Sequence, residues 1–207
     1  MTVKRFAFFS MAVIEYIIAS GNVPDILHAN DWQSALYLIY LCRKYMGRPQ
    51  YAAIRRVFTI HNIEYQGKYG MEILGDVFGI SPMYKGTVEY DGCINLMKGA
   101  IVCADKVTTV SPRYAEEILT QEYSHGLHYI LRENEYKLCG ILNGIDYNYY
   151  APEKDTAIAV NYKAGELDKK YENKLALQRE LGLPERTDVP MIAIISRLAS
   201  HKVFDII

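Results

Sequence analysis

Apolar stretches and short polar breaks alternate along the chain with a spacing that predicts strands alternating with helices. A helix is expected over Phe6–Ala19, where apolar residues occupy most of the circumference, and a short buried strand over Ile26–Ala29. Asp31 is well placed to cap a second helix, Trp32–Met46, and Arg56–Ile60 forms the next predicted strand. A strand, a helix and a second strand in this order are the repeating unit of a parallel sheet.

The same alternation continues toward the end of the chain. The segment from Gly67 to Tyr90 is rich in glycine and aromatic residues and predicts a long loop with short helical pieces, a kind of loop that is usually functional. The other predicted elements are a helix at Ile94–Ala104, a strand at Lys106–Val110, a helix at Tyr114–Leu119, a strand at Leu138–Leu142, a helix at Leu167–Leu181 and a strand at Met191–Ser196. Together they predict an α/β fold with a Rossmann-like parallel sheet and helices on both faces.

Polar side chains follow the predicted strands at the points where the strands end. The residues concerned are His28, Asn30, Asp31, His61, Asn62, Ser111, Asn143, Ser196 and Arg197. Parallel α/β sheets bind ligands outside the carboxyl ends of their strands, so this distribution favours a binding site along that edge. The alternative is that polar residues merely begin the loops there.

The balance of charge excludes some classes of partner. The 207 residues carry 23 basic and 24 acidic side chains, a net charge of −1, which offers no electrostatic attraction to nucleic acid or to an anionic membrane. No apolar run approaches the roughly 20 residues that span a bilayer. Lys4-Arg5 followed by Phe6–Phe9 imitates a signal peptide, but Glu15 interrupts the apolar run, and a helix is the better interpretation.

The four cysteines, Cys42, Cys93, Cys103 and Cys139, form no Cys-x-x-Cys pair, and their neighbours are apolar. This spacing favours buried, reduced thiols of a cytoplasmic protein over a metal site or a disulfide framework. We therefore expect reduced thiols and no metal.

Four short segments form a more specific pattern than any single motif. They are His28-Ala29-Asn30-Asp31-Trp32, Phe58-Thr59-Ile60-His61-Asn62-Ile63-Glu64-Tyr65-Gln66-Gly67, Ile141-Leu142-Asn143-Gly144-Ile145-Asp146, and Ser196-Arg197-Leu198 with Lys202. In this order and spacing they resemble the bacterial glycogen synthases and plant starch synthases, which are retaining glucosyltransferases with two facing Rossmann-like domains, the GT-B arrangement. The resemblance runs along nearly the whole chain, and the second and third segments are its most specific parts.

The resemblance implies an activity, its substrates and a location. The reaction would move glucose from ADP-glucose to the 4-hydroxyl of a growing α-1,4-glucan with retention of configuration. The partners would be a nucleotide sugar and an α-glucan, with no cofactor and no metal, in the cytoplasm or in a plastid if the source is a plant. The residues leave open ADP- against UDP-glucose and the oligomeric state. A non-catalytic glucan-binding module and another GT-B sugar-nucleotide transferase remain alternatives.

The resemblance also assigns catalytic and donor-binding residues. His61 would lie beside the transferred glucose and hydrogen-bond the sugar or the charge that develops at its anomeric centre. Arg197 and Lys202 would stabilise the leaving diphosphate, whose negative charge grows as the glycosidic bond breaks. Arg197 offers a rigid fork of donors and Lys202 a mobile point charge. Asn143 and Gly144 would lie near the donor glucose, where glycine lets the backbone approach closely.

Four residues are implied on the acceptor side. Asp31 could orient an acceptor hydroxyl and the ring of Trp32 could pack on a sugar. Asp31 is equally suited to capping a helix, however, and Trp32 to anchoring the core. Tyr65 and Gln66 lie in the loop that the resemblance places along the acceptor cleft.

Three positions depart from the family's pattern. Asn30 and Gln33 stand where many members carry histidine, and Val203 stands where glycine usually follows the lysine. Because a β-branched valine resists a positive φ and a close backbone approach, the geometry around Lys202 is expected to differ.

The family's Lys-x-Gly-Gly loop and its glutamate-bearing donor segment are absent from these 207 residues. We therefore expect a partial N-terminal, acceptor-side domain at residues 1–150, a connector and linking helix at 151–187, and the first strand and loop of the C-terminal, nucleotide-binding domain at 188–207. Such a fragment is expected to be inactive alone. Residues from about Asp188 onward are expected to lack their native sheet neighbours.

Overall fold

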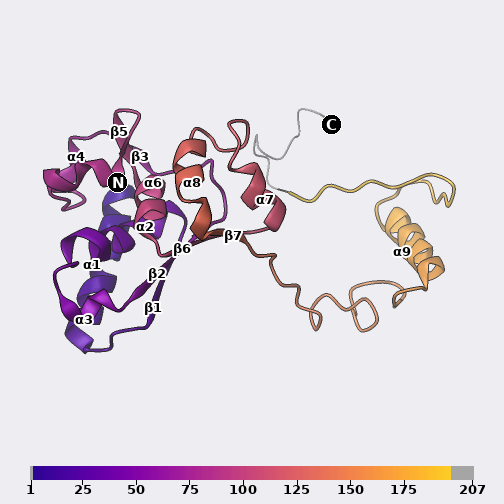
Figure 1. Ribbon diagram of the computed structural model, residues 1–207. Coiled ribbons are helices and arrows are strands. Elements are labelled where there is room, and N and C mark those ends of the chain that lie inside the picture. Colours follow the sequence, from indigo (N-terminus) through magenta and orange to yellow (C-terminus); the bar gives the residue numbers. More distant parts are fainter. Residues whose placement is uncertain (1, 197–207) are drawn as a thin grey trace. The chain divides into compact units, whose positions relative to one another are not determined.

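The computed structural model describes residues 2–196 of the chain (Figure 1). The chain divides into two compact units, Met1–Asn143 and Gly144–Ile207, and each is described here by itself. The first unit holds every strand and all but one of the helices among the described residues.

The first unit is built on a four-stranded, all-parallel sheet. Its strands, in spatial order, are β1 (Ile26–Asn30), β2 (Arg55–Ile60), β6 (Lys106–Thr109) and β7 (Leu138–Gly140). Asn30 pairs with Thr59, and Thr59 pairs with Thr108, so β1, β2 and β6 end close together at one edge. All four strands match predicted ones, and the expected parallel sheet is confirmed.

Helices pack on this sheet and on one another. The longer ones are α1 (Thr2–Ser20), α2 (Asp31–Ile39) and α6 (Leu96–Cys103), and α2 continues directly into a π-helical turn, η1 (Tyr40–Lys44). Helix α2 packs against both α1 and α6 and also covers β1 and β2 (Figure 1). Their shared core is closed, because Ile39, Phe58 and Ile101 have no exposed surface.

Several shorter elements complete the first unit. They are α3 (Pro49–Ala52), α4 (Ile73–Asp76), η2 (Pro82–Tyr84), α5 (Lys85–Val88), α7 (Pro112–Glu117), α8 (His128–Glu133) and η3 (Glu135–Lys137). Helix α7 begins where Ser111 accepts a hydrogen bond from the backbone N–H of Tyr114 at 2.9 Å. That N-cap, together with Pro112 in the first turn, starts the helix earlier than the predicted Tyr114.

The glycine-rich segment after β2 contains a second, smaller sheet that the sequence pattern did not predict. Its antiparallel strands are β3 (Lys68–Tyr69), β5 (Cys93–Asn95) and β4 (Glu89–Tyr90), in that spatial order. Asn95 ends β5 and caps α6, since its side chain accepts a hydrogen bond from the backbone N–H of Lys98 at 3.0 Å. The predicted helix Ile94–Ala104 therefore begins as a strand and becomes helical only from Leu96.

The second unit contains the helix α9 (Leu167–Glu180), close to its predicted bounds. The predicted strand Met191–Ser196 is wrong: these residues form no regular structure. A strand exists only through hydrogen bonds to a neighbouring strand, and the structure describes none between residues 144 and 196. Two of its isoleucines consequently lie in solvent, with Ile192 87% and Ile195 99% exposed.

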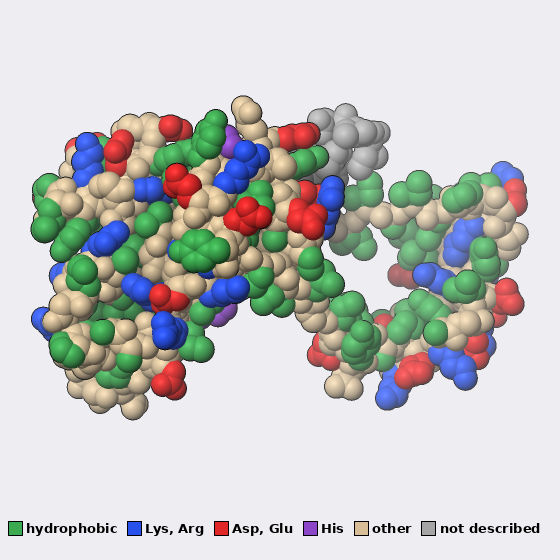
Figure 2. Space-filling model, in the orientation of Figure 1, with side chains coloured by type: hydrophobic (Ala, Val, Ile, Leu, Met, Phe, Trp, Pro, Cys, Tyr) green, Lys and Arg blue, Asp and Glu red, His purple; other side chains and the backbone are tan. Residues whose placement is uncertain are grey.

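Acidic and basic side chains are interspersed over the visible face of the first unit (Figure 2). In the part of the chain that the structure describes, no helix combines the length and the apolar character needed to cross a membrane.

Candidate functional site

The carboxyl ends of β1 and β2 meet at a cluster of polar residues. Asn30 is the last residue of β1, Asp31 is the first residue of α2, and His61 and Asn62 follow β2 directly. One oxygen of the Asp31 carboxylate accepts hydrogen bonds from the backbone N–H of His61 at 2.8 Å and from that of Asn62 at 3.4 Å. Asp31 therefore joins the loop after one strand to the helix after its neighbour.

This arrangement corrects the prediction that Asp31 caps the second helix. The N-cap position belongs to Asn30, whose side chain makes no capping hydrogen bond, and Asp31 itself lies at a φ of 53°. Aspartate is one of the few residues other than glycine that tolerate this left-handed conformation. The turned backbone points the carboxylate across to β2 instead of along α2, while its charge still lies favourably in the first turn of a helix.

Asn30, the last residue of β1, holds the ring of His61. Its Nε2 lies 2.9 Å from the side-chain oxygen of Asn30. Because an amide oxygen only accepts, Nε2 donates the proton in this hydrogen bond. Asn30 holds the ring and Asp31 holds the backbone of His61, and because His61 is exposed its ring is still accessible to a ligand.

Trp32 packs inside the first unit. Its ring makes edge-on contacts with Phe6 and Tyr69, at centroid distances of 5.2 and 6.0 Å. It also lies against the backbone of Gly67, where an added Cβ would approach its Cε3 to 2.8 Å. These contacts make Trp32 an anchor between α1, α2 and the loop after β2; a contact between its ring and a sugar stays a prediction.

Gln66 is buried and holds the loop after β2 through the hydrogen bonds of its side chain. It is only 3% exposed, and its Nε2 donates hydrogen bonds to the carbonyl oxygens of Ile63 at 3.1 Å and His125 at 3.0 Å. Its Oε1 accepts a third, at 2.7 Å, from the side chain of Asn95. Gln66 thus joins three segments of the first unit and presents no free amide at the surface. Tyr65, predicted with it, is half exposed.

Sequence reasoning missed a further group that supports the site from β6 and α7. The hydroxyl of Tyr114 accepts a hydrogen bond from the backbone N–H of Ile63 at 3.2 Å. Burial raises the pKa of Tyr114, so its hydroxyl stays protonated at neutral pH.

Across the sheet, the hydroxyls of Thr59 and Thr108 lie 2.6 Å apart, and His28 Nε2 lies 2.6 Å from Thr59. The sequence signal for this row of His28, Thr59 and Thr108 was the pair of threonines at matching positions of two predicted strands.

The described structure does not test the predicted donor-binding residues. Asn143 ends the first unit and Gly144 begins the second; both are exposed, and an added Cβ at Gly144 would meet nothing within 4 Å. Arg197, Lys202 and Val203 lie outside the described residues. The structure therefore assembles Asn30, Asp31, His61 and Asn62 but leaves the predicted phosphate pair untested.

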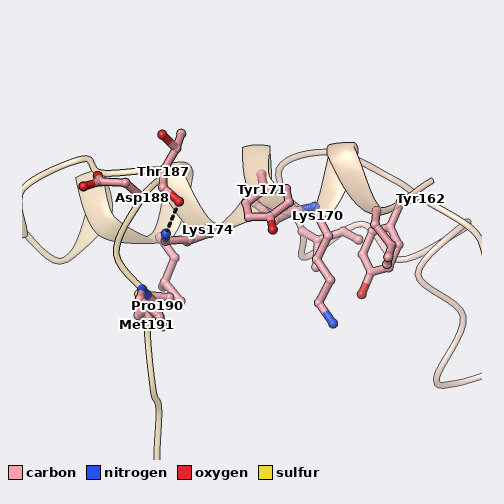
Figure 3. Close-up of a pocket in the computed structure, with 12 residues that line it drawn as sticks. Tyr162, Lys170, Tyr171, Lys174, Thr187, Asp188, Pro190 and Met191 are labelled. Carbon is pink, nitrogen blue, oxygen red and sulfur yellow. Dashed lines mark hydrogen bonds between the residues drawn. The ribbon is translucent and has the colours of Figure 1, made fainter. Parts of the chain in front are cut away.

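A cavity among the described residues of the second unit is a different feature. It has a volume of about 660 Å³ and lies between α9 and the segments on either side of it, and none of the predicted site residues lines it (Figure 3). Two of its polar side chains bond within the unit: Lys174 donates hydrogen bonds to the carbonyl oxygens of Thr187 and Val189, and Asn173 bonds both backbone groups of Val160. Among the described residues, no group of three or more His, Cys, Asp or Glu side chains could hold a metal ion.

Comparison with known proteins decides the family. Residues 2–133 match the family model described as the starch synthase catalytic domain. The chain belongs to the starch synthase catalytic domain family. Across 99% of its length it is 48% identical to the glycogen synthase of Ligilactobacillus salivarius and 47% identical to that of Streptococcus agalactiae.

The fold of this starch synthase family member also matches that of a solved structure. The catalytic domain of starch synthase IV from Arabidopsis thaliana, bound to ADP and acarbose, matches 88% of the chain with a TM-score of 0.75 and 37% identity. This likeness confirms the GT-B fold class. The chain spans 43% of the length of the two curated relatives and 38% of the plant chain.

Proposed function

We propose that this chain forms the acceptor side of a retaining glucosyltransferase that extends α-1,4-glucan from ADP-glucose. The observation that carries the proposal is His61, an exposed residue whose ring is held by Asn30 and whose backbone is held by Asp31, at the carboxyl ends of two neighbouring parallel strands. Such strand ends are where α/β sheets bind ligands. The names of the relatives support glucan synthesis, and a structural neighbour that binds ADP and acarbose supports a nucleotide and an oligosaccharide as ligands.

In the proposed mechanism the chain supplies positioned polar groups. His61 directs a ring nitrogen at the transferred glucose and stabilises hydroxyl groups or charge near its anomeric centre. Arg197 and Lys202 neutralise the diphosphate as it leaves, and Asn143 with Gly144 contacts the donor glucose. Interactions of this kind accelerate transfer because they strengthen as charge develops in the transition state.

On the acceptor side we propose a direct role for Tyr65 and an indirect one for Asp31, Trp32 and Gln66. Half of the Tyr65 side chain is exposed, and an aromatic ring of this kind is suited to packing on a sugar. The contacts of the other three lie mainly within the protein, so their contribution is to hold the loop and His61 in place.

We propose the domain limits expected from the sequence: an acceptor-side domain at 1–150, a connector with its helix at 151–187, and the start of a nucleotide-binding domain at 188–207. The division of the chain after Asn143 supports a boundary in this region.

The test uses a protein that carries this sequence together with the remaining length of its relatives. His61→Ala should lower kcat for glucose transfer from ADP-glucose to glycogen by roughly 10²–10³, with little change in the affinity for ADP. The control is Met83→Ala, a 76%-exposed position on η2, which should transfer at the unaltered rate. An unchanged kcat in the His61 variant would refute the assignment.

A second measurement separates the enzyme from a non-catalytic glucan-binding module. The proposed transferase should bind ADP and release it as glucan grows. Glucan binding with no response to ADP or ADP-glucose would favour the binding module instead.

A further inference from the structure

The first unit contains a cavity of about 300 Å³ that none of the predicted site residues lines. One wall is the π-helical turn η1, which contributes Tyr40, Arg43 and Lys44. The opposite wall is the segment from Gly79 to Tyr84, between α4 and α5. Because π-helical turns that continue an α-helix are frequent at functional sites, this cavity is a candidate for a ligand.

Hydrogen bonds hold the two walls of the cavity together within the protein itself. The hydroxyl of Tyr40, a residue only 1% exposed, donates to the carbonyl oxygen of Phe78 at 2.8 Å. In the opposite wall the backbone N–H of Ile80 donates to the carbonyl oxygen of Leu74 at 3.1 Å. The cavity is therefore preformed, which lowers the ordering cost of binding a ligand there.

Arg43 lies in this cavity with one side of its guanidinium fixed. Its Nε donates a hydrogen bond to the hydroxyl of Thr87 at 2.8 Å, and Thr87 is buried. Among the described residues no acceptor bonds its two Nη nitrogens, and no carboxylate forms an ion pair with it. A guanidinium held in this way is suited to two parallel hydrogen bonds with a phosphate or a carboxylate.

Lys44 adds a second positive charge to the same wall. Its ammonium group lies 5.8 Å from the ring centroid of Tyr40, 5.5 Å from that of Tyr45 and 3.9 Å from the sulfur of Met11. In the part of the chain that the structure describes, it has no carboxylate partner, and Glu15 of the neighbouring helix α1 accepts a hydrogen bond from Tyr45 instead. Two cations without a counter-charge favour an anion that carries two charges.

The rest of the cavity suits a small ring. Ile80 is buried and Tyr84 half-buried, so both can cover an apolar surface, and the exposed hydroxyl of Ser81 can bond a polar group of the ligand. Sites for small molecules begin at about 300 Å³, and this cavity has that size. Its volume fits a single ring better than a whole nucleotide sugar.

We propose that this cavity binds a small phosphomonoester, in which one phosphate group is carried by one compact ring. The phosphate bonds the free Nη nitrogens of Arg43 and the ammonium group of Lys44. The ring packs against Tyr84 and Ile80. The dianionic phosphate supplies the counter-charge that the two cations lack within the described structure.

This site is separate from the cluster around His61. Helix α2 begins at Asp31, and η1 continues it to Lys44. The rise of a helix places Arg43 roughly 18 Å from Asp31 along this axis. The inference therefore does not depend on the proposed glucosyl transfer, and its test needs no enzymatic activity.

The experiment titrates the folded, isotope-labelled 207-residue chain with phenyl phosphate and follows its backbone amide signals by NMR. At about pH 7.5 the phosphate is mostly a dianion. The signals of Arg43, Lys44, Ile80, Ser81 and Tyr84 should shift together and saturate. Inorganic phosphate, which lacks the ring, and benzyl alcohol, which lacks the charge, should each bind roughly tenfold more weakly or less. Equal affinity for phenyl phosphate and inorganic phosphate, or shifts confined to other residues, would overturn the proposal.

Variants test the two cations separately. Arg43→Gln should weaken the binding of phenyl phosphate roughly tenfold and Lys44→Gln roughly fivefold. Lys44 is exposed and bonds no oxygen of the described residues, so Lys44→Gln keeps the test valid if Arg43→Gln, which gives up the bond to Thr87, fails to fold. The control is Lys85→Gln, an exposed cation next to Tyr84 that does not line the cavity, and it should bind with unchanged affinity. Unchanged affinity in Lys44→Gln, or an equal loss in Lys85→Gln, would contradict the proposal.

Discussion

The carboxylate of Asp31 accepts a hydrogen bond from the backbone N–H of His61 at 2.8 Å. This bond joins the start of α2 to the end of β2, and it requires Asp31 to adopt a φ of 53°. Backbone strain of this kind persists where the surrounding structure fixes it, which is common at functional sites. Asp31 is therefore better understood as a positioning residue for His61 than as a helix cap.

The first prediction concerns that bond. Asp31→Ala leaves the His61 N–H without its acceptor and places alanine in a left-handed conformation, so the free energy of unfolding should fall by about 2 kcal/mol. Asp31→Asn keeps an acceptor oxygen and tolerates the conformation, so it should cost about half as much. Urea denaturation of the chain measures both. Equal losses in the two variants would show that the hydrogen bond does not hold the loop.

The second prediction concerns the contact between Gly67 and Trp32. Gly67 has a φ of +67°, and a Cβ there would lie 2.8 Å from the Trp32 ring, so Gly67→Ala should destabilise the first unit by about 2–4 kcal/mol. Gly79 has a similar φ of +60° but open space around it, so Gly79→Ala should cost only about 1 kcal/mol. Thermal unfolding compares the two. Similar shifts in the unfolding temperature of the two variants would mean that the Trp32 ring moves aside without loss of stability.

The third prediction concerns pH. Burial opposes ionisation of Asp105, but its hydrogen bonds with the side chain and backbone of Arg56 outweigh this and lower the pKa of its carboxyl. A carboxyl whose pKa is lower in the folded state than in the unfolded state stabilises the fold at pH values above its unfolded pKa, near 4. It loses that contribution as the pH falls through its folded pKa. Asp105→Asn should thus cost about 1 kcal/mol at pH 7 and much less below pH 3.

Urea titrations at several pH values provide the measurement for Asp105. The control is Asp188→Asn, which removes a fully exposed partner of Arg186 and should leave the stability unchanged at every pH. An Asp105 variant whose deficit stays constant between pH 3 and pH 7 would contradict the assigned ion pair.

The fourth prediction concerns the rate at which iodoacetamide alkylates Cys42. With a pKa of about 6, Cys42 is mostly thiolate at pH 7, so its alkylation rate should rise with pH, reach half its maximum near pH 6 and level off above pH 7. At pH 7 it should react roughly two- to threefold faster than an ordinary cysteine, because the greater nucleophilicity of the ordinary thiolate offsets most of its lower ionisation. Peptide mapping after timed quenching measures the rate. In Cys103→Ala, which removes the neighbouring donor, the half-maximal point should move to higher pH.

The elements of the first unit were largely predictable from sequence. The short apolar stretches between polar breaks located all four parallel strands, because a strand covered on both faces of a sheet is a short apolar run in the sequence. The strand Met191–Ser196 was the exception. Its apolar run is a strand-like pattern, but a strand also needs a partner, and none lies beside it in the described structure.

The site was predictable only in part. The sequence by itself determined that polar residues gather where β1 and β2 end, and its four motifs predicted the family that the comparisons show. Only the tertiary structure decided that Asp31 binds the backbone of His61 and that Gln66 faces inward to bond His125 and Asn95. Local periodicity fixes which face of an element is buried, whereas these pairings depend on sheet register and helix packing, which bring together residues far apart in the chain.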